Sequence, residues 1–288
     1  MHKPPATALA LFALACAVLS AASCAGRAGS RSSPETQLVA HRGGAALAPE
    51  NTLAAFRSGL AHGADALELD VHLSQDGRLV VIHDPAIDRT TNGSGIVADL
   101  SLAQLKALDA SFRFKGPSAG PQEIPTLEEV LELLAAPGNG RVGLQVEIKT
   151  RADGSRYPGI EEALVSVLRA WSLVELTAAI SFDFASLQTI AGLEPGLRTC
   201  ALVGKDYFKA AAAFTPDRIA RSLAALGVDS VGVREQNLDR GLYEALRREG
   251  LGVGAWTVDE SGRMRSLAAL GVDFITSNRP DLFRQVVP

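Results

Sequence analysis

Two acidic residues stand two apart in the apolar run ALELDVHL, and a third ends a later run, VGLQVEIK. Because side chains alternate along a strand, Glu68 and Asp70 would project from one face. In a parallel barrel the apolar face packs on the helices, so both carboxylates would point inward and require a compensating charge. With Glu147 they would form an all-oxygen site for one divalent cation, Mg²⁺ or Ca²⁺. A solvated strand face, or an ion pair of Glu147 with Lys149, is the simpler alternative.

Two histidines each end a short apolar run and are followed by a charged residue. They are His41, before Arg42, and His83, before Asp84. Imidazole titrates near neutrality, so two such rings beside a cation site are suited to act as a general acid and a general base. A role as metal ligands is the alternative, although cations that prefer oxygen make poor use of imidazole.

Positive charge for an anionic substrate is available nearby. Arg42 offers a planar guanidinium fork and Lys149 a point charge, both suited to a phosphodiester. In the motif APENT, Asn51 is expected to be the N-cap of the first helix. Glu50 would either compensate the dipole of that helix or orient a neighbouring side chain.

Two aromatic residues also stand at the ends of apolar runs, Phe182 in ISFD and Trp256 in GVGAWTV. In a barrel, the carboxyl ends of the strands carry the active site. Both rings are therefore candidates to bind substrate, with a place in the apolar core as the alternative.

The elements that would position these residues are short apolar runs alternating with helical patterns, which is typical of a sheet built from βα units. Nine runs are candidate strands, one more than a barrel of eight needs, so one must be short, peripheral or misread. They are residues 38–41, 67–71, 79–83, 142–148, 179–182, 199–203, 230–233, 252–258 and 274–276.

Three segments predict the same junction of helix end, left-handed Gly and strand. SLAALGVD occurs at residues 222–229 and again at 266–273, and GLAHGADALELD begins at residue 59. The connection from residue 71 to 79 is too short for a crossover helix. Residues 85–125 are interpreted as an insertion beside the active-site mouth, with a short helix opened by Ser101 and Gln104 in capping-box spacing. The next helix begins at Thr126, with Glu129 three residues later.

Composition places the chain among ordinary globular proteins. Its 288 residues are 47% apolar, with a net charge of -4 and no Lys/Arg-rich run, so no nucleic-acid partner is expected. Residues 1–23 resemble a secretory signal and residues 24–36 a flexible linker before the barrel at 37–288. Small residues before Cys24 resemble a lipobox, which predicts an exported lipoprotein anchored to the membrane through Cys24. Ordinary cleavage to a periplasmic or secreted protein is the alternative.

HRG, PENT, ELDV, HD with RTTNG, EIK, SFD, WTV and ITSNRP occur in this order over residues 38–283. The pattern resembles the glycerophosphodiester phosphodiesterase family. The resemblance implies an α/β fold, a (β/α)8 TIM barrel with a small insertion after the third strand. It also implies hydrolysis of glycerophosphodiesters to glycerol 3-phosphate and an alcohol. By matching motifs, the metal ligands are Glu68, Asp70 and Glu147, the acid and base His41 and His83, and the phosphate clamp Arg42 and Lys149.

Two other functions stay open at this point. Related barrels that cleave inositol or sphingo-phospholipids share parts of this pattern, and a surface lipoprotein could bind phosphodiesters without hydrolysing them. The residues also leave open whether the attacking oxygen belongs to water or to the substrate's own glycerol hydroxyl. One departure from the family pattern is Asn278 in ITSNRP, commonly Asp, which is expected to be the N-cap before Pro280.

Overall fold

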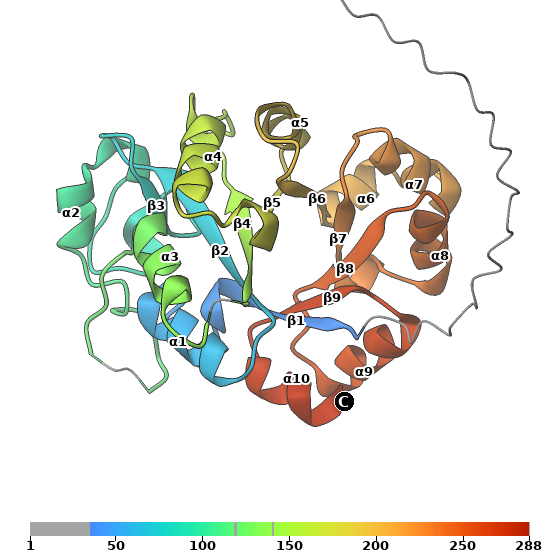
Figure 1. Cartoon of the computed structure of the whole chain (residues 1–288), viewed down its shortest axis with the longest axis horizontal. Coiled ribbons are helices and arrows are strands. Elements are labelled where there is room, and N and C mark those ends of the chain that lie inside the picture. The colour runs from blue at the N-terminus through green and yellow to red at the C-terminus, as the bar shows by residue number, and fades with distance from the viewer. Residues whose placement is uncertain (1–34, 118–119, 140, 288) are drawn as a thin grey trace, which may run out of the picture. The chain divides into compact units, whose positions relative to one another are not determined.

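The structure of the protein, a computed structural model, describes residues 35–117, 120–139 and 141–287. Its centre is a closed barrel of parallel strands in the order β1-β9-β8-β7-β6-β5-β4-β2, and pairing of β1 with β2 closes it (Figure 1). This confirms the predicted (β/α)8 barrel. The barrel strands are β1 (Gln37–Ala40), β2 (Ala66–Leu73), β4 (Gly143–Ile148), β5 (Thr177–Ser181), β6 (Arg198–Val203), β7 (Ser230–Arg234), β8 (Gly252–Trp256) and β9 (Phe274–Ser277).

Helices surround the barrel (Figure 1). They are α1 (Leu53–Ala61), α2 (Leu102–Lys106), α3 (Leu127–Ala135), α4 (Ile160–Ala170), α5 (Phe184–Leu193), α6 (Lys205–Ala210), α7 (Pro216–Ala224), α8 (Arg240–Arg248), α9 (Ser261–Leu270) and α10 (Pro280–Val286). Short 3₁₀ turns add η1 (His41–Gly43), η2 (Ile87–Arg89), η3 (Val97–Asp99), η4 (Val174–Leu176) and η5 (Glu235–Asn237). Within the described ranges, no helix has the length and apolar composition needed to span a membrane.

The ninth candidate strand is β3 (Leu79–Val81), which lies outside the barrel. It pairs antiparallel with β2, because the short connection folds back as a hairpin in which Gly77 adopts a φ of 75°. Residues 82–126 then form the insertion, in teal and green in Figure 1, with a small apolar cluster of its own. The insertion follows β3, the third strand along the chain. Because β3 is not part of the barrel, the insertion lies between the second barrel strand, β2, and the third, β4. Both predicted capping boxes are present, at the starts of α2 and α3.

The three predicted junctions share a second feature. Each Gly has a positive φ, 73° at Gly63, 74° at Gly227 and 94° at Gly271. Two residues later an Asp carboxylate accepts a backbone N–H from the neighbouring strand. Asp65 accepts from Leu38, Asp229 from Thr199 and Asp273 from Val253, each at 2.7 Å. These bonds fix the start of one strand against the next, which sets the register that carries the site residues.

The two faces of β2 divide as the alternation predicts. Leu67, Leu69 and Val71 pack in the large apolar cluster between strands and helices. The opposite face presents Glu68 and Asp70 to the barrel interior, where both are buried. A small apolar cluster that includes Ile180 and Phe274 fills the rest of that interior. The acids are therefore held in a desolvated place by well-packed strands.

Candidate active site

Three carboxylates meet where β2 and β4 run side by side. Asp70 is the register partner of Glu147, and Glu68 lies two residues earlier on β2. One oxygen from each of the three acids lies within 4.8 Å of the others, and all three side chains are buried. Lys149 donates to Glu147 at 2.7 Å, so the ion pair left open by the sequence is present as part of this cluster.

The charges around these acids do not suffice to ionise all of them. Burial and the charges of Asp70 and Glu147 raise the pKa of Glu68 well above its usual range, and burial raises the pKa of Glu147 to about 7. Burial opposes ionisation of Asp70 as well, but Lys149 and Arg42 outweigh it and hold the pKa of Asp70 below its usual range. Asp70 Oδ1 is buried without a hydrogen bond, and its ion-pair partner is Lys149 Nζ, 3.3 Å away. An all-oxygen donor set in which one buried carboxylate oxygen makes no hydrogen bond fits a hard divalent cation.

His41 stands directly after β1, in the turn η1, and faces the acids. Its Nε2 lies 3.9 Å from Glu68 Oε2. Its Nδ1 donates to Asn278 Oδ1 at 2.7 Å, and the Asn278 amide nitrogen donates to Asp259 at 2.8 Å. The expectation that Asn278 is an N-cap is wrong, because Arg279 holds the cap position of α10 and Asn278 faces His41 instead. Burial lowers the pKa of His41 to about 4, so the resting ring is neutral with Nε2 as its free base.

His83 lies on the chain just past β3 and reaches the same cluster. Its Nδ1 contacts Asp84 Oδ1 at 2.5 Å. Burial lowers the pKa of His83, although the charge of Asp70 and the hydrogen bond to Asp84 act in the opposite direction. His72, buried on β2, contacts the backbone carbonyl of His83 through Nε2 at 3.0 Å and so ties the loop to the barrel.

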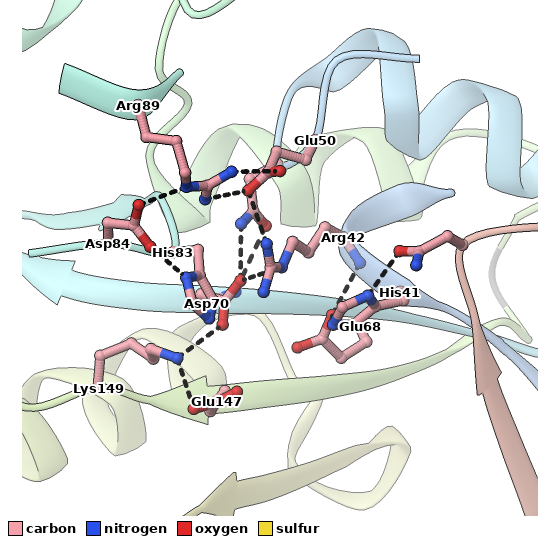
Figure 2. Close-up of polar contacts among 12 residues, drawn as sticks. His41, Arg42, Glu50, Glu68, Asp70, His83, Asp84, Arg89, Glu147 and Lys149 are labelled. Atoms are coloured by element: carbon pink, nitrogen blue, oxygen red, sulfur yellow. Dashed lines mark hydrogen bonds and ion pairs between the residues drawn. The ribbon is translucent and has the colours of Figure 1, made fainter. Parts of the chain in front are cut away.

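A chain of ionic contacts connects Arg42 with His83, as Figure 2 shows. Arg42 donates to Glu50 at 2.8 Å, and Arg89 from the insertion donates to both oxygens of Glu50, at 2.7 and 2.9 Å. Arg89 Nε then donates to Asp84, which holds His83. Glu50 therefore contacts Arg42, as the second of its two predicted roles requires, and the role itself stays a prediction.

Asn51 is not the N-cap of α1, contrary to the expectation from APENT. The cap is Thr52, whose hydroxyl accepts from the Ala55 N–H at 3.2 Å. An N-cap needs extended backbone, whereas Asn51 has a φ of 57°. That conformation points its side chain at Asp70, to which Nδ2 donates at 2.7 Å. Asn51 thus fixes the orientation of one predicted metal ligand.

A cavity of about 590 Å³, its open mouth included, lies over the acids at the carboxyl ends of the strands. His41, Arg42, Glu68, His83 and Glu147 form its polar side. The opposite wall is apolar and contains Phe182 and Trp256, whose rings meet edge to face with centroids 5.3 Å apart. A charged cluster facing an apolar wall suits a substrate with an anionic centre and a less polar end.

The structure brings the predicted site residues together around the cavity, from His41 in η1 to Trp256 at the end of β8. Their chemical roles stay predictions. Cys24 lies outside the described residues. Sequence reasoning missed Arg89, Asn51 and Asn278 as partners of the site. Arg89 is the first residue of the motif RTTNG, and Asn278 lies in ITSNRP. Both motifs were recognised in the sequence, but neither residue was predicted to bind another polar residue of the site.

Comparison with known proteins decides the family. The model of the glycerophosphoryl diester phosphodiesterase family matches residues 41–282. The chain belongs to this family. A glycerophosphodiester phosphodiesterase of Caldanaerobacter subterraneus subsp. tengcongensis is 36% identical over 258 residues, which cover 88% of this chain and 98% of that protein. The chain is accordingly an enzyme, a phosphoric diester hydrolase of the glycerophosphodiester phosphodiesterase class.

Solved structures agree with this family fold. A glycerophosphodiester phosphodiesterase from Agrobacterium tumefaciens superposes with a TM-score of 0.70 at 32% identity, covering 87% of this chain and 100% of that one. An Oleispira antarctica phosphodiesterase, solved with the product sn-glycerol-3-phosphate, gives a TM-score of 0.70 at 26% identity, covering 88% and 97%.

Proposed function

We propose that this family member hydrolyses glycerophosphodiesters to sn-glycerol 3-phosphate and an alcohol, with one divalent cation and a pair of catalytic histidines. The observation that carries the proposal is the buried triad Glu68, Asp70 and Glu147 beside His41 and His83 in one cavity. The Oleispira antarctica relative, bound to sn-glycerol-3-phosphate, supports the choice of product.

The triad would hold Mg²⁺ or Ca²⁺, which when bound would neutralise and polarise the phosphoryl group. Arg42 lies beside the triad with its Nε 3.3 Å from Asp70 Oδ2, and Lys149 Nζ lies 3.3 Å from Asp70 Oδ1. We propose that the side chains of Arg42 and Lys149 bind the non-bridging oxygens of the diester. The apolar wall that contains Phe182 and Trp256 would take the carbon skeleton of one end.

Hydrolysis forms a bond from the attacking oxygen to phosphorus and breaks the bond from phosphorus to the leaving alcohol. One ring must accept the proton of the attacking oxygen, and the other must deliver a proton to the leaving oxygen. His41 is held neutral with Nε2 free, so it is the better acceptor. The Asp84 carboxylate on Nδ1 of His83 partly offsets the burial that lowers the pKa of this ring, so of the two histidines we assign the donor role to His83.

Release of sn-glycerol 3-phosphate from glycerophosphocholine by the purified full-length chain tests the proposal. EDTA should abolish it, and added Mg²⁺ or Ca²⁺ should restore it. His41→Ala and His83→Ala should each lower kcat by about 10²- to 10⁴-fold. His62→Ala is the matched control, because this exposed histidine lies at the end of α1 and its ring contacts the Ser58 carbonyl. Full activity in excess EDTA would contradict the cation, and binding of the diester without product release would favour a binding protein.

We also propose that the chain is exported and anchored to the membrane by a lipid on Cys24. The support is sequence alone: an Ala/Leu run, then Ala21, Ala22 and Ser23 before the cysteine. The mass of the mature protein made in bacteria tests this. Acylation should add lipid mass at Cys24 and place the protein with the membranes, and Cys24→Ser should release it. An unmodified start after residue 25 would refute the anchor.

A further inference from the structure

A second cavity adjoins the first across a shared wall. It encloses about 1180 Å³ with its open mouth, and Phe182, Leu202 and Trp256 line both cavities. The indole of Trp256 is fixed in this wall because Nε1 donates to the Gly232 carbonyl at 2.8 Å. A diester whose phosphorus sits over the acidic triad would extend one end past this wall into the second cavity.

The lining of the second cavity also includes two cations. Arg234 ends β7 and is the register partner of Trp256, and Lys205 begins α6. Asp206 is the acid that lines this cavity with them. In the described part of the chain, neither Arg234 nor Lys205 has an ion pair or a side-chain hydrogen bond, whereas Arg42, Arg89 and Arg263 are all paired.

Arg234 is half-buried and Lys205 is exposed, so Arg234 is the more desolvated of two cations that gain no counter-charge from the described part of the protein. Partial desolvation of an unpaired charge is unfavourable, and an anionic ligand would compensate it. Two cations against one acid leave a surplus of positive charge in the cavity. A phosphate monoester carries about -1.5 to -2 charges at neutral pH, which matches a pair of cations better than a carboxylate does.

We propose that the second cavity binds the leaving alcohol of the diester and selects headgroups that carry a second phosphate, through Arg234 and Lys205. This inference rests on the proposed hydrolysis of glycerophosphodiesters and names their preferred class. The shared aromatic wall separates the scissile phosphate over the triad from the terminal phosphate beside Arg234. The site would therefore discriminate between alcohols that differ only in that terminal charge.

Glycerophosphoinositol and glycerophosphoinositol 4-phosphate form a matched pair of substrates, since one phosphate distinguishes them. Each partly exposed ion pair contributes about threefold, so the phosphorylated diester should have a kcat/KM about tenfold higher. Arg234→Met and Lys205→Met should each reduce this ratio, and the double variant should bring it close to one. Because the ratio is measured within each variant, a general loss of activity does not change it.

Arg198→Met is the control variant, since Arg198 is exposed at the start of β6, the end of the barrel opposite the site. It should keep the wild-type ratio. A wild-type ratio near one, or a ratio unchanged in the double variant, would overturn the headgroup site. Hydrolysis of glycerophosphoinositol in the same experiment would still support the proposed function. If neither diester nor glycerophosphocholine is hydrolysed, the proposed function fails, and calorimetry then tests the headgroup site by comparing the binding of the two inositol diesters. Equal affinities would then overturn it.

Discussion

Arg89→Met would remove the side chain through which the insertion joins Glu50 to Asp84 (Figure 2). Three charge-assisted hydrogen bonds would be lost, two to Glu50 and one to Asp84. Arg89 is 45% exposed, so each bond is worth less than a buried one, and together they contribute about 2 kcal/mol. Because Glu50 holds Arg42 and Asp84 holds His83, we expect the loss to lower kcat/KM by about 30-fold.

The assay is hydrolysis of glycerophosphocholine, with the melting temperature recorded for each variant. Arg78→Met is the matched control: Arg78 is 48% exposed and pairs with Glu128, away from the site. Arg89→Lys should keep more activity than Arg89→Met because it keeps the positive charge. It should stay below the wild type because an ammonium group cannot hold both carboxylates as a guanidinium fork does. A double-mutant cycle of Arg89→Met with Asp84→Asn should be non-additive. The reasoning is refuted if Arg89→Met matches Arg78→Met within twofold, or if the two changes add.

Three further outcomes concern stability. Burial raises the pKa of Glu147 from 4.5 to about 7 in the cation-free fold, so the contribution of Glu147 to folding stability is present below about pH 4.5 and is lost as the pH rises through about 7. Mg²⁺ or Ca²⁺ should therefore raise Tm more at about pH 8 than at about pH 5.5. Equal shifts of Tm at the two pH values would contradict this. A Cβ at Gly254 would lie 2.0 Å from the Phe274 ring, so Gly254→Ala should lower the free energy of unfolding in urea by about 1–3 kcal/mol. Adding Phe274→Leu should recover part of this loss. An unchanged free energy of unfolding for Gly254→Ala would argue against this packing. Asp229→Ala removes the bonds to the Thr199 N–H at 2.7 Å and to its hydroxyl at 3.2 Å, and should cost about 1–2 kcal/mol in urea unfolding. Asp217→Ala removes only an exposed ion pair with Arg248 and should leave the free energy of unfolding essentially unchanged. Similar costs for the two variants would count against the strand-capping role of Asp229.

The sequence by itself determined the features that depend on neighbouring residues. The spacing of Glu68 and Asp70 places both on one face of β2, since alternation along a strand is local geometry. The capping boxes at Ser101 and Thr126 and the left-handed glycines before β2, β7 and β9 also follow from residues a few positions apart. From these signals the βα winding, the insertion and the pair of acids on one face could be predicted, while the closed (β/α)8 barrel was implied by the resemblance to the family.

Only the tertiary structure decided which distant polar groups pair. Asn51 and Asn278 each looked like a helix cap, because capping is the local use of an asparagine. In the fold, Asn51 donates to Asp70, 19 residues away, and Asn278 contacts His41, 237 residues away. Arg89 meets Glu50 only because the insertion packs beside the loop of residues 45–50. Such pairings depend on barrel closure and on where a long loop settles, and neither is encoded in the spacing of nearby residues.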